Sequence, residues 1–228
     1  MLLKKWEQLP EELHNDEVRG YFTYLKKRTG SLIVKRLLDI VVSFLLILLL
    51  SPVLLVISLV ILCDSRGGVF FRQKRVTTYG RVFRIFKFRT MVSDAEKLGS
   101  QVTVKNDSRV TRSGRVLRKY RLDELPQLFN ILIGDMSLVG TRPEVPRYVD
   151  AYTDEMKATL LLPAGVTSLA SIQYKDEDRL LADAENADQV YIEEILPEKM
   201  KYNLAYLREF SFFRDIKLMF QTVAAVLH

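Results

Sequence analysis

Hydrophobic residues are concentrated in one uncharged block near the start of the chain, from Ile40 to Leu62. As an α-helix, this block would be roughly 35 Å long at about 1.5 Å per residue, enough to cross a ~30 Å hydrocarbon core. Ser51 and Pro52 divide the block almost in half. Proline lacks an N–H and its ring clashes with the preceding turn, so Pro52 should kink or break the helix. The Ser51 hydroxyl could then bond a carbonyl left free.

The flanks of the apolar block bear on how it meets a membrane. Each half would be about 15 Å long, half of a ~30 Å hydrocarbon core. Both flanks are basic, with Lys35 and Arg36 before the block and Arg66 and Arg72 after it. Under the positive-inside rule, two basic flanks do not orient a helix that spans the membrane. They do fit a helix whose two ends both lie on the cytoplasmic side. From the residues alone, a re-entrant helix–break–helix and a kinked single span are equally compatible. Asp39 lies close to the membrane and should pair with Lys35 or Arg36.

The segment after the block alternates apolar and basic residues from 67 to 91. Tyr79-Gly80 is a turn signal within it, so a short hairpin or extended segment is expected. Residues 93–99 contain a capping-box pattern and predict a short helix. Arginines then recur at every third position from 109 to 121, which places several of them on one helical face. That face is either a solvated surface or a cationic wall facing a diphosphate.

Two adjacent acids, Asp123 and Glu124, follow the arginines and precede Pro126. Proline suits the first turn of a helix, and the apolar residues after it predict a short buried helix that Gly134 ends. The acids would then lie at a helix N-terminus, where free backbone N–H groups favour carboxylates and phosphates. A helix cap with solvated acids is the simpler alternative. The loop-forming run from Gly134 to Pro143 favours a functional site.

The remaining segments are expected to be mostly helical. Apolar residues at helical spacing predict one amphipathic helix that Pro163 and the two residues after it end: Tyr148, Tyr152, Met156 and Leu160. The aromatic-rich run from 204 to 227 predicts an amphipathic helix that packs on the core or lies at a membrane surface. Residues 1–30 are polar and should be helical in pieces, with Pro10 at the start of one of them.

Charge is segregated along the chain. Residues 66–121 contain 16 Lys or Arg and 3 acids, whereas the whole chain has a formal net charge of +6. A basic segment directly after an apolar block favours anionic lipid or phosphorylated substrates, and no nucleic-acid partner is expected. The single cysteine, Cys63, excludes an internal disulfide. The two histidines lie at opposite ends, which argues against a histidine-based triad or zinc site.

The run RLDELPQLFNILIGDMSLVG, followed by Thr141-Arg142-Pro143, resembles the signature of the bacterial monotopic phosphoglycosyl transferases, also called sugar transferases. The resemblance extends from about Lys35 to the C-terminus and includes a KFRTM motif at 87–91. It implies a monotopic protein on the cytoplasmic face of the bacterial cell membrane, in contact with membrane lipids.

The expected fold class is α/β, mostly helical with few short strands. Three parts are expected along the chain. Residues 1–32 form a polar N-terminal extension, and residues 33–64 form a re-entrant membrane helix broken at Ser51-Pro52. Residues 65–228 form a single cytoplasmic catalytic domain that ends in the amphipathic helix.

The resemblance also implies a reaction. Members move a sugar-1-phosphate from a UDP-sugar to a membrane polyprenyl phosphate such as undecaprenyl phosphate, and release UMP. This is the first membrane step in assembly of an exopolysaccharide, capsule or glycoprotein glycan. Asp123 would be the nucleophile that forms a covalent aspartyl phosphosugar intermediate. Glu124 would hold Mg²⁺ or act as a base.

The basic site residues are also implied by the resemblance. Arg118 would hold phosphate, Arg142 would contact the uridine nucleotide, and Lys87 and Arg89 would line the site. Thr141 replaces the first proline of the family's motif at this point.

The residues themselves describe a carboxylate pair beside arginines and next to a membrane. That arrangement suits phosphoryl transfer with Mg²⁺, which Asp123 and Glu124 would bind together with phosphate oxygens. One rival is a membrane-anchored protein that binds anionic lipid or nucleic acid through residues 66–121, with salt-sensitive affinity and no dependence on Asp123. Another is a membrane nucleotide-sugar hydrolase that uses the same acids to transfer to water. Each of these hypotheses is compatible with a homodimer.

Overall fold

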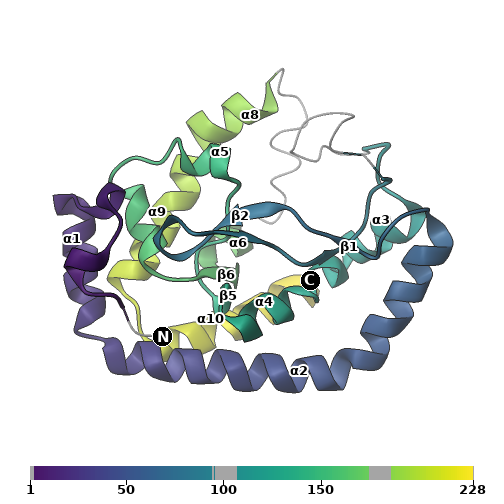
Figure 1. The fold of residues 1–228 in the computed structure, drawn as a ribbon, viewed down its shortest axis with the longest axis horizontal. Helices are drawn as coiled ribbons and strands as arrows, with labels where there is room; N and C mark the ends of the chain where they lie inside the picture. The colour runs from purple at the N-terminus through teal and green to yellow at the C-terminus, as the bar shows by residue number, and fades with distance from the viewer. Residues whose placement is uncertain (1–2, 94, 96–106, 175–185, 228) are drawn as a thin grey trace.

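The computed structural model describes residues 3–93, 95, 107–174 and 186–227. Its described elements are helices with a few strands of two to four residues, which confirms the expected fold class (Figure 1). The helices are α1 (Asp16–Lys26), α2 (Thr29–Asp64), α3 (Arg112–Lys119), α4 (Gln127–Ile133), α5 (Pro146–Val149), α6 (Leu169–Gln173), α8 (Ala187–Val190), α9 (Leu196–Arg208) and α10 (Phe212–Leu227). The strands are β1 (Phe70–Phe71), β2 (Lys74–Val76), β3 (Val82–Arg84), β4 (Lys87–Phe88), β5 (Met136–Val139) and β6 (Ala164–Thr167). The short helix expected at residues 93–99 lies almost wholly outside the described residues.

The apolar block lies within α2, which curves along the bottom and one side of the molecule (Figure 1). The remaining elements lie on its concave side. Near its start α2 contacts α4, α10 and β5, and near its end it contacts α3. Its most apolar 18-residue window is only 6% buried within the protein. Such a surface is not that of a core helix, and it indicates association with a membrane.

Pro52 bends α2 but does not end it. The sequence predicted two helices broken at Ser51-Pro52, whereas α2 runs without interruption from Thr29 to Asp64. Pro52 has no N–H to give to the Leu48 carbonyl four residues earlier, and the Ser51 hydroxyl donates to that carbonyl at 2.8 Å. The freed carbonyl is therefore satisfied within the helix, as the sequence suggested. The bend in Figure 1 lies in this part of α2.

The pairing expected for Asp39 is wrong. Lys35 forms a buried ion pair with Asp215 at 2.7 Å, and Arg36 donates to the carbonyls of Ile131 and Leu132. Asp39 instead accepts a hydrogen bond from the backbone N–H of Leu138 at 2.9 Å. The start of α2 is buried against β5 and α10, so its charged groups find partners far away in the sequence.

Residues 67–91 form the expected hairpin. Strands β2 and β3 pair antiparallel, and Tyr79 and Gly80 in the turn both have positive φ values, of 58° and 75°. Strands β1 and β4 pair beside them. Strands β5 and β6 form a separate parallel pair. Just after β5, the backbone at Gly140 passes very close to Gly165 on β6. A Cβ added to Gly165 would lie 2.1 Å from the Gly140 nitrogen.

The helix expected from Tyr148 to Leu160 is not continuous. It consists of α5 and a 3₁₀ segment, Met156–Leu161, with irregular chain between them. The Thr153 side chain accepts a hydrogen bond from the Met156 N–H at 3.3 Å, so it begins a new turn instead of continuing the old one. The C-terminal amphipathic helix is likewise divided, into α9 and α10, and Ser211 accepts from the Arg214 N–H at the start of α10.

The polar N-terminal residues pack onto the main body. Helix α1 buries Val18, Phe22 and Leu25 in the same apolar cluster as Leu161 and Phe210. This cluster joins α1 to α9 and to the 3₁₀ segment. The expectation of helical pieces is confirmed by two 3₁₀ turns that precede α1.

Candidate active site

The two acids lie in a 3₁₀ turn, Leu122–Glu124, between α3 and α4. Arg121 has a left-handed φ of 55° and reverses the chain after α3. Pro126 caps α4, and Gly134 ends it with a φ of 96°. The predicted helix is therefore confirmed, and the acids lie immediately before it.

Glu124 is the most strongly paired acid in this turn. Its Oε1 accepts from Arg142 Nη2 at 2.6 Å and from Lys87 Nζ at 3.1 Å, and Arg121 lies 3.8 Å away. Burial opposes ionisation of Glu124, but the charges of Arg142, Lys87 and Arg121 outweigh it and hold its pKa well below the usual value. Glu124 is therefore ionised across the physiological range.

Asp123 has the opposite character. It is buried, with 8% of its surface exposed, and among the described residues its Oδ1 has no hydrogen-bond partner. Burial raises the pKa of Asp123, with a contribution from the charge of Glu124, and Lys87 and Arg118 offset this only in part. Two neighbouring carboxylates thus have pKa values displaced in opposite directions, a pattern typical of sites that assign different roles to paired acids.

Strand β4 and its neighbours position Lys87. Asn130 on α4 accepts from the Phe86 N–H at 2.7 Å and donates to the Arg84 carbonyl, so it fixes the chain just before β4. Burial lowers the pKa of Lys87, and Glu124 opposes that shift. Asn130 and its partner Asp135, which forms an ion pair with Arg81 at 2.8 Å, thus have structural roles.

Three of the predicted basic residues converge on the acid pair and one does not. Lys87 and Arg142 contact Glu124, and the charge of Arg118 acts on Asp123. Arg118 is also held by Thr90, whose hydroxyl accepts from Nε at 2.9 Å. Arg89 is directed elsewhere.

Arg89 is buried and binds the chain at the C-terminal end of α2. Its guanidinium donates to the carbonyls of Ser65 and Arg66 and to the Ser65 hydroxyl at 2.7–3.0 Å. Its expected place in the lining of the site remains a prediction. The contacts in the structure attach the membrane helix to the strand that also carries Lys87.

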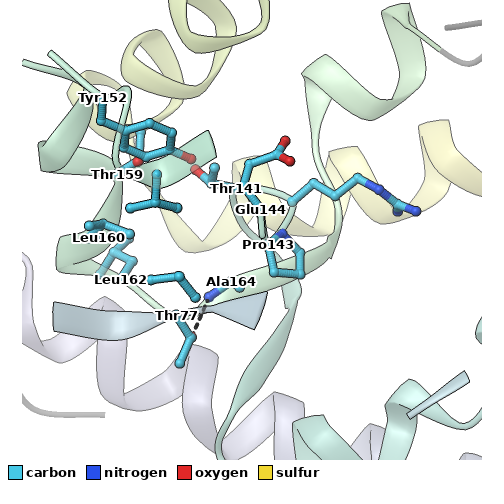
Figure 2. A pocket seen from close by; sticks show the side chains of 12 residues that line it. Thr77, Thr141, Pro143, Glu144, Tyr152, Thr159, Leu160, Leu162 and Ala164 are labelled. Carbon is cyan, nitrogen blue, oxygen red and sulfur yellow. Dashed lines mark hydrogen bonds between the residues drawn. The ribbon is translucent and has the colours of Figure 1, made fainter. Parts of the chain in front are cut away.

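A small cavity lies behind the loop that carries Arg142. Figure 2 shows Tyr152 and Thr159 on one side of it, with Thr141, Pro143 and Glu144 on the other. Tyr152 stays neutral, because burial and the charge of Glu144 raise its pKa well above the usual value.

Two charged residues near this loop were not singled out from the sequence. Arg75 on β2 is largely buried, and donates to the Pro143 carbonyl at 3.0 Å. Glu144 is buried with 6% of its surface exposed. In the sequence Arg75 is one of many basic residues that follow the apolar block, and Glu144 lies just after Arg142 and Pro143. The sequence feature that could have identified both is a charged residue beside residues expected to be buried.

Comparison with known proteins decides the family. A model of the bacterial sugar transferase family matches residues 30–228. The chain belongs to the bacterial sugar transferases. The match includes all of α2 but its first residue, both acids and the C-terminal helices, so the resemblance seen in the sequence is confirmed.

Three relatives illustrate the family. The chain is 36% identical over 197 residues to the UDP-N-acetylgalactosamine-undecaprenyl-phosphate N-acetylgalactosaminephosphotransferase of Aeromonas hydrophila, covering 85% of this chain and 44% of the relative. It is 38% identical over 198 residues to the UDP-glucose:undecaprenyl-phosphate glucose-1-phosphate transferase of Klebsiella pneumoniae, covering 85% and 40%. A relative of the same name from Caulobacter vibrioides is 36% identical over 196 residues, covering 85% and 69%. This sugar transferase thus spans less than half the length of the first two.

Proposed function

We propose that this chain is a phosphoglycosyl transferase that moves a sugar-1-phosphate from a UDP-sugar to a membrane polyprenyl phosphate and releases UMP. The observation that carries the proposal is Asp123, a buried carboxylate whose Oδ1 has no hydrogen-bond partner among the described residues. It lies among Lys87, Arg118 and Arg121. An unsolvated carboxylate among cations is suited to attack a phosphorus atom whose own charge the cations neutralise.

The reaction has two balanced steps. A carboxylate oxygen of Asp123 forms a bond to the β-phosphorus of the UDP-sugar, and the bond from that phosphorus to the bridging oxygen breaks, releasing UMP. A phosphate oxygen of the polyprenyl phosphate then attacks the same phosphorus. The acyl phosphate bond breaks, Asp123 regains its carboxylate, and the product is a polyprenyl diphosphate sugar. Undecaprenyl phosphate is the acceptor named for the relatives and is the first acceptor to test.

Arg142 and Lys87 have a place in both steps. In the structure they neutralise Glu124, at 2.6 and 3.1 Å. When a diphosphate enters, the same two cations can share their charge between Glu124 and the phosphate oxygens. Arg118 acts on Asp123 from the other side and would hold the transferred phosphate.

A magnesium ion fits this site as a partner of the substrate phosphates. No group of three or more metal-binding side chains occurs among the described residues, so the protein offers no closed metal cage there. It does offer the partnerless Oδ1 of Asp123 and the ionised Glu124 beside it. One or two carboxylates with phosphate oxygens is the usual ligand set of Mg²⁺. The ion would neutralise diphosphate charge when bound.

The experiment that tests the function measures UMP release by detergent-solubilised protein with a panel of UDP-sugars and Mg²⁺. The panel is assayed with and without undecaprenyl phosphate. Sustained UMP release that requires the lipid supports the transferase and identifies the sugar. Sustained release without lipid would support the nucleotide-sugar hydrolase instead. Salt-sensitive binding to anionic vesicles with no UMP from any donor would support the membrane-anchored binding protein.

The pH profile of the reaction should have two limbs set by named residues. Asp123 must be ionised to attack, and its raised pKa moves the acid limb of kcat/KM to higher pH than an ordinary aspartate would give. Lys87 must be charged, and its lowered pKa brings the alkaline limb below that of an ordinary lysine. Lys87→Arg should move the alkaline limb to higher pH, because a guanidinium stays protonated.

The matched control for the pH experiment is Lys119→Arg, which changes an exposed lysine on α3. Its profile of kcat/KM should follow that of the wild type at both ends. An alkaline limb in Lys87→Arg that coincides with the wild-type limb would remove Lys87 from the reaction.

We also propose that α2 is re-entrant and enters the bilayer from the cytoplasmic face. At its start, Lys35 pairs with Asp215 of α10. At its end, Asp64 accepts from the N–H and hydroxyl of Ser113 on α3. A helix that spanned the bilayer would place these two attachments on opposite sides, yet both belong to one folded body.

Thiol labelling tests the topology. Gly30→Cys and Gly68→Cys place single thiols in the first turn of α2 and after its end, in a Cys63→Ser background. Both glycines are exposed, and a Cβ added to either meets no atom within 4 Å. A membrane-impermeant maleimide should label both thiols in inverted vesicles and neither in intact spheroplasts. Labelling of the two thiols from opposite sides would show a spanning helix.

A further inference from the structure

A buried polar network lies directly behind the loop that carries Arg142. Glu144, two residues later, accepts at Oε1 from the Tyr191 hydroxyl at 2.6 Å. Lys199 donates to that hydroxyl at 2.8 Å and lies 3.5 Å from the same carboxylate oxygen. All three residues are buried, with 3–6% of each exposed. A buried ion pair with its hydrogen bonds completed is costly to break at one partner.

Hydrogen bonds hold the backbone of this loop, in addition to those that hold the Glu144 side chain. Arg75 Nη1 donates to the Pro143 carbonyl at 3.0 Å, and the Val76 N–H donates to the Glu144 carbonyl at 2.9 Å. Arg75 also lies 4.0 Å from the Glu144 carboxylate. The loop is thus attached to β2 on one side and to the C-terminal helices on the other.

The turn before α9 explains how Tyr191 and Lys199 reach one carboxylate. They are eight residues apart, and in an unbroken α-helix they would be rotated by about 80° around the axis. The chain from Tyr191 to Ile195 forms a π-turn, which adds one residue. The rotation falls to about 20°, as for residues seven apart. The π-turn therefore aligns both side chains on the face that meets Glu144.

The charges of the network bear on the active site. Burial lowers the pKa of Arg75, Glu144 opposes that shift, and the neighbouring charge of Arg142 adds to it. Arg75 and Arg142 also both lower the pKa of Lys87. Glu144 is thus the counter-charge to a set of cations that continues to Lys87. Its charge offsets part of the repulsion between Arg75 and Arg142.

We propose that Glu144, Tyr191 and Lys199 are positioning residues that hold the loop of Arg142 in place for the sugar nucleotide. They face the back of the loop, whereas Arg142 faces Glu124 at 2.6 Å. They act on the substrate through Arg142 alone. The proposal rests on the proposed function in one respect, that Arg142 meets the nucleotide or its phosphates.

The test compares Glu144→Gln with Tyr191→Phe, which keeps the ring that packs on Tyr148 at 4.6 Å. Each variant should raise KM for the UDP-sugar on the order of tenfold, with a smaller effect on kcat, because misplaced binding groups lose affinity. In an Arg142→Met background the same two changes should leave KM unaltered, since the residue through which they act is gone. Arg147→Gln, which breaks an exposed ion pair on neighbouring α5, is the matched control.

A second measurement does not depend on turnover. Hydrogen exchange of peptides covering residues 140–145 should be faster in Glu144→Gln and Tyr191→Phe than in wild type or Arg147→Gln. Unchanged exchange would overturn the proposal, as would a KM increase that persists in the Arg142→Met background. Wild-type protein that releases no UMP from any donor would overturn the proposed function instead, and the exchange experiment would still decide whether the network holds the loop.

Discussion

Asp123→Asn is expected to abolish sustained UMP release, with a fall in kcat of roughly 10³-fold or more, as for loss of other covalent nucleophiles. The amide has nearly the shape of the carboxylate but cannot form the acyl phosphate. The same change should not weaken folding. Burial raises the pKa of Asp123, so its charge is a cost to the folded state at neutral pH that the neutral amide removes. Steady-state UMP release and thermal unfolding in the same detergent measure the two effects.

The covalent step can be isolated from the second transfer. Wild-type protein mixed with UDP-sugar but no lipid should gain the mass of one phosphosugar on the peptide that contains Asp123, and Asp123→Asn should not. Glu124→Gln is the informative neighbour. It removes the partner of Arg142 and Lys87 but leaves Asp123 in place. An Asp123→Asn variant that turns over at the wild-type rate would exclude the aspartyl intermediate.

The sequence anticipated the features whose causes are local. Pro126 and Gly134 mark the ends of α4 because one lacks an N–H and the other tolerates a positive φ. The turn at Tyr79-Gly80 produced its hairpin for a similar reason. Lys87 lies in that hairpin, and it meets Glu124 because Asn130 fixes the chain just before β4.

The features that the sequence did not predict depend on partners remote in the chain. Arg89 looks like any other arginine of the basic segment, and only the folded position of Ser65 directs it to the end of α2. Lys35 pairs with Asp215, which lies 180 residues away in the sequence. The buried position of Glu144 depends on Tyr191, which lies 47 residues away in the sequence. Helical periodicity near Tyr148 was real, but Thr153 bonded the backbone and divided the helix.

The attachment of α2 reaches the strand that leads to the active-site loop. Lys35 donates to the Val139 carbonyl at 2.7 Å as well as to Asp215, and Asp39 accepts from the Leu138 N–H. Both carbonyl and N–H belong to β5, and the chain continues from there to Arg142. Helix α2 and the loop that carries Arg142 are therefore parts of one packed unit, joined through β5.

Lys35→Met should destabilise the protein by about 3–5 kcal/mol, the usual effect of removing one partner from a buried ion pair. It leaves the carboxylate of Asp215, which is 2% exposed, with the Tyr206 hydroxyl at 2.7 Å as its one remaining side-chain donor among the described residues. Such a loss is comparable with the whole stability of a typical domain, about 5–15 kcal/mol. Denaturant unfolding in detergent, followed by the fluorescence of the single tryptophan, Trp6, measures it.

Two further variants distinguish loss of the buried ion pair from a general loss of packing as the cause of the lower stability. Arg147→Gln removes an ion pair whose arginine side chain is 62% exposed, and it should change the free energy of unfolding by less than about 1 kcal/mol. Asp215→Asn added to Lys35→Met should recover part of the loss. The amide carries no charge and can still accept from Tyr206, so the buried uncompensated charge is gone. If Lys35→Met unfolded at the same denaturant concentration as Arg147→Gln, the buried pair would not be what fastens α2 to α10, and β5 would have to hold the membrane helix through Asp39.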